Sequence, residues 1–143
     1  MSDTSGATIT GVHHFSPTVS DVEASAAWYE QVFSMVRLPM PFPHHEREET
    51  GYALLLIEPV SGLLIGLHHN EANEGERFDE ARTGLDHIGL RVPTRESLDD
   101  WVTKLDGLGI SHTGIRDITE PAPFSTLVFR DPDNIQLEFI YQA

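Results

Sequence analysis

An internal duplication constrains the fold of this chain more than any other feature of its sequence. When the sequence is shifted by 73 residues against itself, His14 aligns with His87 and Trp28 aligns with Trp101. The two aligned segments are GVHHFSPTVSDVEASAAWYEQVF and GLDHIGLRVPTRESLDDWVTKLD. A solenoid needs at least three stacked repeats, so two copies predict a pair of similar modules that close on each other.

Both copies contain the same order of expected elements. A short strand, over residues 9–18 in the first copy and 87–92 in the second, precedes an amphipathic helix. Three further strands follow each helix, so the order β-α-β-β-β occurs twice. These strands are expected at residues 36–40, 52–58 and 63–68 in the first copy and at 111–118, 125–130 and 135–141 in the second.

Capping signals support the two helices. Ser20 with Glu23 three residues later is a capping-box pattern, and Thr94 is the expected N-cap of the second helix. Gly107 or Gly109 is expected to end that helix, because glycine adopts the left-handed conformation common after a helix C-terminus.

The length of 143 residues predicts one domain, which we place at residues 9–142. The first module spans 9–69, a connection spans 70–84, and the second module spans 85–142. The connection contains five acidic residues and two arginines, so it is expected to be solvated, with room for a short helix.

The composition excludes several classes of function. With 23 acidic and 9 basic side chains, the net charge of −14 argues against nucleic acid and against an anionic membrane surface as partners. The absence of cysteine excludes disulfides and thiolate metal sites. No segment approaches the roughly 20 apolar residues of a membrane span, and the N-terminus lacks the pattern of a signal peptide. The expected location is therefore cytoplasmic.

The duplicated segments and the closing sequence FRDPDNIQLEFI resemble the vicinal oxygen chelate superfamily of glyoxalases, bleomycin-resistance proteins and type I extradiol dioxygenases. The resemblance covers about residues 9–142. It implies an α+β fold in which tandem βαβββ modules form paired curved mixed sheets around a pocket. It also implies a homodimer, and leaves open whether the modules of one chain close on each other or on those of a partner.

The resemblance implies metal ligands on the first and last strands of the modules. Carried over position by position, these are His14, His87 and Glu138, while the last strand of the first module has Gly66 at the matching position. Two imidazoles and one carboxylate form an open site that suits Fe²⁺ and related divalent metals, so Fe²⁺, Mn²⁺, Ni²⁺ or Zn²⁺ is the expected cofactor.

Several alternatives at this site remain open from the sequence. His68 lies two residues beyond Gly66 and shares its strand face, so it could replace the missing ligand. His44 is expected in a solvated loop, PFPHHEREE, that could also form a flap over the pocket. His68 and Tyr52 are weak candidates for an acid or base. The inner strand faces should form the pocket walls, and the candidates there are Tyr52, Leu54, Leu56, Phe124, Thr126 and Phe139.

The resemblance favours a divalent-metal-dependent enzyme that acts on a small oxygen-bearing organic substrate. Glyoxalase-like lyases and isomerases use a last-strand carboxylate from each module, and Gly66 removes one of them. Dioxygenase-like chemistry is therefore favoured over lyase or isomerase chemistry. The alternative is a metal-free protein that binds an antibiotic or toxin, which the incomplete ligand set also allows.

Overall fold

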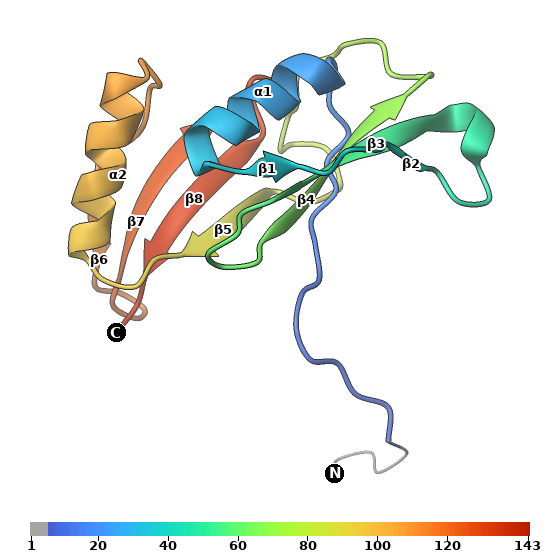
Figure 1. Cartoon of the computed structure of the whole chain (residues 1–143). Helices are drawn as coiled ribbons and strands as arrows, with labels where there is room; N and C mark the ends of the chain where they lie inside the picture. The colour runs from blue at the N-terminus through green and yellow to red at the C-terminus, as the bar shows by residue number, and fades with distance from the viewer. Residues whose placement is uncertain (1–5) are drawn as a thin grey trace.

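Two four-stranded sheets, each accompanied by one long helix, make up the fold (Figure 1). The computed structural model describes residues 6–143. The elements of the first copy are α1 (Val22–Phe33), β1 (Val36–Arg37), β2 (Phe42–Pro43), the 3₁₀ turn η1 (Glu48–Thr50), β3 (Gly51–Ile57) and β4 (Leu64–Asn70). Those of the second copy are β5 (His87–Arg91), α2 (Glu96–Gly107), β6 (Arg116–Ile118), β7 (Phe124–Arg130) and β8 (Gln136–Tyr141).

In the first sheet, β3 pairs with β1 and β2 along one edge and with β4 along the other. The strand at residues 36–40, which its prolines predict to be an irregular edge, is short and divided: β1 and β2 are two separate two-residue strands. Pro39, Pro41 and Pro43 lie in this stretch, and proline has no N–H to donate to a continuous ladder.

The strand expected at residues 9–18 is also not continuous. An extended segment runs parallel to β4 and is joined to it by bridges at Phe15–Ile65 and Thr18–His68. The backbone of Phe15 both donates to Leu64 and accepts from Gly66. Pro17 accepts a bond from His68 but cannot donate one, which interrupts the ladder.

The second sheet has the order β5-β8-β7-β6. β5 is parallel to β8, and the other pairs are antiparallel, so this sheet is mixed as expected. The parallel register places Gly89 of β5 opposite Glu138 of β8. The antiparallel register places Val128 of β7 opposite the same glutamate.

The helix caps differ in detail from the sequence prediction. Asp21 is the N-cap of α1, and its carboxylate accepts from the Ala24 N–H at 3.0 Å. Ser20 is not the cap and instead bonds the carboxylate of Asp133 through its N–H and its hydroxyl. In the second copy, Arg95 is the N-cap of α2, and the expected cap Thr94 lies one residue earlier, where its Oγ1 accepts from Ser97 N at 3.1 Å.

Both copies contribute to one hydrophobic core. Phe33 at the end of α1 contacts Trp101 of α2, with ring centroids 6.0 Å apart, and Phe139 of β8, also at 6.0 Å. Trp101 in turn packs on Phe139 at 4.1 Å. Each sheet therefore buries the face that carries its helix. Among the described residues, no helix has both the length and the apolar character needed to cross a membrane.

A buried carboxylate joins the two copies. The Tyr29 hydroxyl, on α1, donates to Asp131 Oδ2 at 2.7 Å, and Asp131 Oδ1 accepts from the backbone N–H groups of Asp133 and Ile135. Burial raises the pKa of Asp131, while these hydrogen bonds act in the opposite direction. The DPDN turn between β7 and β8 is thus anchored to the helix of the other copy.

We expect Tyr29→Phe to lower the free energy of unfolding by about 1–3 kcal/mol, because it removes one of the three donors to a buried carboxylate. Urea denaturation measures this loss. Tyr52→Phe is the matched control, since the Tyr52 hydroxyl has no hydrogen-bond partner among residues 6–143. Equal losses in the two variants would contradict the assigned role of Asp131.

Candidate functional site

In each sheet, the face opposite the helices is open and carries the polar residues of interest. In the second sheet, Ile88, Leu137 and Phe139 are buried on the helix side. Because side chains alternate along a strand, His87 and Glu138 point to the other face. The family resemblance predicts a pocket position for both residues, and the register of β5 and β8 places them on the same face of the sheet.

His87 and Glu138 form a close pair on this open face. His87 Nε2 lies 3.2 Å from Glu138 Oε2, and His87 Nδ1 lies 2.7 Å from Asp86 Oδ1. The Thr126 hydroxyl donates to the other oxygen of Glu138. In a neutral His87 that donates its Nδ1–H to Asp86, the lone pairs of Nε2 and Oε2 face each other. Such an arrangement of outer partners is typical of metal-ligating histidine.

The open face of the first sheet has a separate hollow of about 250 Å³. Phe15 packs against the core, so alternation turns His14 and Ser16 to the open face. His14 Nδ1 lies 2.8 Å from His13 Nδ1. The residues that line the hollow are His13, His14, Ser16, Phe42, Pro43, His45, Ala53, Leu55, Leu64 and His68.

His68 is held by a second histidine that the sequence analysis placed in a solvated loop. His44 is only 4% exposed, and its Nε2 lies 2.8 Å from His68 Nδ1. On its other side, His44 Nδ1 lies 2.7 Å from Thr50 Oγ1. Burial lowers the pKa of His68, and the charges of His44, Arg47 and His14 lower it further. The prediction of a solvated position for His44 is therefore wrong, whereas His45 is exposed as expected.

A side chain at Gly66 would require the neighbouring side chains to move. A Cβ at this position would lie 2.9 Å from Ser16 Oγ and 3.2 Å from Leu55 Cδ2. The pairs Leu55–Gly66 and Ala53–His68 place Gly66 and His68 on the same face of β4. His68 is thus the nearest imidazole to the position that Gly66 leaves without a ligand.

One chain does not bring the three predicted ligands together. Across residues 6–143, no group of three His, Asp or Glu side chains is placed to hold a metal ion. His14 shares the hollow of the first sheet with His68, while His87 and Glu138 pair on the second sheet. The set His14, His87 and Glu138 therefore stays a prediction, and a single chain supplies it only as two half-sites.

The remaining candidates are placed elsewhere. Tyr52 pairs with His69 on the face of β3 opposite to His68, with ring centroids 5.2 Å apart, and does not line the hollow. Among the expected pocket walls, Leu54, Leu56 and Phe139 lie in the core instead. The sequence does not fix the inner face of β3, because Leu54, Leu55 and Leu56 are all apolar and give no alternation.

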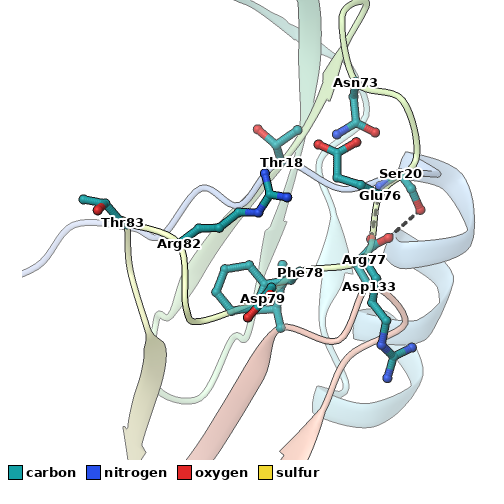
Figure 2. Close-up of a pocket in the computed structure, with 12 residues that line it drawn as sticks. Thr18, Ser20, Asn73, Glu76, Arg77, Phe78, Asp79, Arg82, Thr83 and Asp133 are labelled. Carbon is teal, nitrogen blue, oxygen red and sulfur yellow. Dashed lines mark hydrogen bonds between the residues drawn. The ribbon is translucent and has the colours of Figure 1, made fainter.

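A polar hollow of about 300 Å³ lies beside the connection between the modules (Figure 2). The connection is held to the DPDN turn: Phe78 N donates to the Asp133 carbonyl at 2.9 Å, and the Asn134 side chain donates to the Phe78 carbonyl at 2.9 Å. Figure 2 shows Arg82 directed toward Thr18 in this hollow. The segment was expected to be solvated, and no sequence pattern indicated that it folds back on the turn.

Comparison with known proteins identifies the family. A sequence model of the Glyoxalase/Bleomycin resistance protein/Dioxygenase superfamily matches residues 11–139. A putative ring-cleaving dioxygenase, MhqA of Bacillus subtilis, is 25% identical over 129 residues, which are 90% of this chain and 39% of that protein. The chain thus spans well under half the length of this relative.

Solved structures have the same fold. A glyoxylase/bleomycin resistance protein/dioxygenase domain from Frankia sp. EAN1pec is 30% identical with a TM-score of 0.81, covering 95% of this chain and 94% of that one. The fosfomycin resistance protein FosX of Listeria monocytogenes, solved with Mn(II) and 1S,2S-dihydroxypropylphosphonic acid, is 16% identical with a TM-score of 0.65 and covers 95% of both chains. The latter similarity concerns the fold alone.

The lowered pKa of His68 predicts a pH dependence of stability. A histidine with a depressed folded-state pKa stabilises the fold above its unfolded pKa of about 6.5, and this contribution is lost as the pH falls through the folded pKa. Between pH 7 and pH 5, the free energy of unfolding should therefore fall more steeply in the wild type than in His68→Gln. Urea denaturation at several pH values measures both slopes. His45→Gln should keep the wild-type slope, and a wild-type slope in His68→Gln would contradict the prediction.

Proposed function

The chain belongs to the glyoxalase/bleomycin resistance protein/dioxygenase superfamily, and from that premise we propose that it is a divalent-metal-dependent enzyme acting on a small oxygen-bearing organic substrate. The observation that carries the proposal is the pair of His87 and Glu138. Their facing atoms lie 3.2 Å apart, and each side chain is held from behind by another residue, Asp86 or Thr126. A cation bound between these atoms would take one ligand from each side chain.

The donor set fits a divalent metal. His87 Nε2, one oxygen of Glu138 and an imidazole nitrogen of His14 would supply two nitrogen ligands and one oxygen ligand, which suits Fe²⁺, Mn²⁺, Ni²⁺ or Zn²⁺. A metal held by three protein groups keeps positions open for substrate, and as a Lewis acid it polarises the substrate oxygens. The protein groups orient these ligands: Asp86 fixes the ring of His87, and Thr126 fixes the carboxylate of Glu138.

We propose that two copies of the chain complete each site. His14 of one chain would join His87 and Glu138 of the other, because one chain holds these residues on separate sheets. Two exposed apolar side chains support this arrangement. Val12 and Leu85 are each 74% exposed, and each lies two residues before one of the histidines. Burial of such residues favours association, and two-fold dimers are the commonest oligomers.

Ring-opening dioxygenation is the chemistry we favour within this class. Gly66 removes the carboxylate that a lyase or isomerase of this superfamily would use. The MhqA relative is named as a putative ring-cleaving dioxygenase. His68 is the residue we propose for proton transfer, because it lines the same hollow as His14.

A metal-free binding protein is the second candidate. One observation favours it: within residues 6–143 of one chain, no three His, Asp or Glu side chains are placed to hold a metal ion. The hollow of the first sheet, with Phe42, Leu55 and Leu64 in its lining, would then hold an apolar antibiotic or toxin. Elemental analysis of protein purified without added metal separates the two candidates.

Metal should stabilise the protein if the first proposal holds. A metal at 100 times its dissociation constant adds about 2.7 kcal/mol when it binds only the native state. The melting temperature should rise with Fe²⁺, Mn²⁺, Ni²⁺ or Zn²⁺, and this rise should vanish in His87→Ala. His69→Ala is the control, because His69 pairs with Glu71 at the surface and lies outside the hollow. An equal rise in wild type and His87→Ala would indicate nonspecific binding.

Mixing variants tests whether the ligands come from two chains. His14→Ala and His87→Ala should each lose the metal. After the two are unfolded and refolded together, random pairing gives half heterodimers, each with one intact site of two, so about a quarter of the wild-type metal content per chain should return. A mixture of His87→Ala and Glu138→Ala should recover none, because both ligands lie on the same half-site. No recovery in the first mixture would contradict the two-chain site.

A further inference from the structure

We propose that Thr50 and His44 are positioning residues that hold His68 as its Nδ1–H tautomer, so that the bare Nε2 atom faces the hollow and accepts a proton from a ligand hydroxyl. This deepens the proposed function and rests on it for the identity of the ligand. The assignment of the tautomer itself rests on a chain of hydrogen bonds that begins at the 3₁₀ turn η1.

The Thr50 hydroxyl determines which atom donates in each of these hydrogen bonds. Thr50 Oγ1 lies 2.7 Å from the carbonyl oxygen of Arg47 and 2.7 Å from His44 Nδ1. A carbonyl oxygen carries no proton, so two oxygens at this distance require the hydroxyl proton to lie between them. A hydroxyl has only one proton to donate. Thr50 Oγ1 must therefore accept from His44, which places the proton of His44 on Nδ1.

The proton position on His44 then determines the donor in its hydrogen bond with His68. With its proton on Nδ1, a neutral His44 has a lone pair on Nε2, and this atom lies 2.8 Å from His68 Nδ1. The two ring planes differ by 21° with centroids 4.8 Å apart. An N–N distance of 2.8 Å is shorter than the contact of stacked rings, so the rings meet edge to edge. With both rings neutral, His68 donates this bond, and its own proton is therefore on Nδ1.

His68 Nε2 is left as a bare acceptor. It has no hydrogen-bond partner among residues 6–143, and it is not sealed from solvent, since the described part of the chain contains no buried side-chain nitrogen or oxygen without a partner. A Cβ on Gly66 would lie 3.7 Å from this nitrogen. The absence of a side chain at Gly66 thus keeps the space in front of Nε2 free.

The backbone at Gly51 leaves space for the His44 ring at the start of β3. Gly51 begins β3 with a φ of +146°, and a Cβ there would lie 1.9 Å from the His69 carbonyl oxygen and 3.2 Å from His44 Cε1. Only glycine allows this close approach. The ring of His44 is consequently packed against the start of β3, which accounts for its burial in an otherwise exposed segment.

The tautomer determines which ligand group the hollow accepts. A bare Nε2 accepts a hydrogen bond from a hydroxyl and repels a carbonyl oxygen, whereas an Nε2–H would donate to either kind of oxygen. When the hydroxyl proton is transferred, the ligand O–H bond breaks and its electron pair stays on the ligand oxygen, which becomes an oxyanion. An N–H bond forms at Nε2, and the positive charge resides on the His68 imidazolium. The bond from Nδ1–H to His44 is kept throughout the transfer.

Long-range ¹H–¹⁵N NMR of the labelled full-length protein at neutral pH tests the tautomer directly, because protonated and bare imidazole nitrogens have well-separated shifts. The His68 signals, assigned by their loss in His68→Gln, should show a protonated Nδ1 and a bare Nε2. His44→Phe and the near-isosteric Thr50→Val should both shift His68 toward a mixture of tautomers. Thr50→Ser should restore the wild-type pattern, and His45→Gln should not change it.

A protonated Nε2 in the wild type, or an unchanged His68 tautomer in both His44→Phe and Thr50→Val, would overturn the proposal. Circular dichroism on each variant establishes that it is folded, and Thr50→Val keeps the test decisive if His44→Phe does not fold. The measurement needs neither metal nor substrate. A wild-type Nδ1–H tautomer in a protein that binds no metal would therefore refute the proposed function and leave the assignment of Thr50 and His44 intact.

Discussion

The carboxylate of Asp131 is the interaction on which the rest of the arrangement depends. It is buried, so it needs its hydrogen-bond donors, and Tyr29 supplies one of them from the other copy of the duplication. This bond, with that of Ser20 to Asp133, ties α1 to the turn of the second sheet. The helix sides of both sheets consequently share one core. The open faces of the two sheets point away from this core. The two half-sites, His14 on one sheet and the pair of His87 and Glu138 on the other, are therefore separate.

The two copies share the same order of elements, but the positions of one glycine and one polar side chain are exchanged between them. On the first sheet, serine at position 16 on the leading segment faces glycine at position 66 on the last strand, and a Cβ on that glycine would lie 2.9 Å from the serine hydroxyl. On the second sheet, the glycine is on the leading strand at position 89, where a Cβ would lie 3.8 Å from Oε2 of Glu138. Each copy thus pairs one polar side chain with one glycine, on opposite strands.

The sequence could predict those parts of the structure in which apolar residues recur at the regular spacing of a helix or strand. The helices followed from such spacing, whereas His87 and Glu138 were named from the family resemblance. The strand between residues 36 and 40 did not follow from such spacing, because prolines interrupt its ladder. The inner face of β3 was missed because three successive leucines hide the alternation. The burial of His44 depends on Gly51, on the 3₁₀ turn and on β4, and none of these contacts leaves a pattern near PFPHH.

The separation of the two half-sites has a consequence for how such a protein would respond to its own abundance. Under the proposed two-chain arrangement, self-association and ligand capture are thermodynamically linked, so each strengthens the other by the same factor. At concentrations well below the dissociation constant of the dimer, the number of complete sites would grow with the square of the protein concentration. Expression level would then act as a threshold, with little activity in a cell that makes few copies and a steep rise once synthesis is induced.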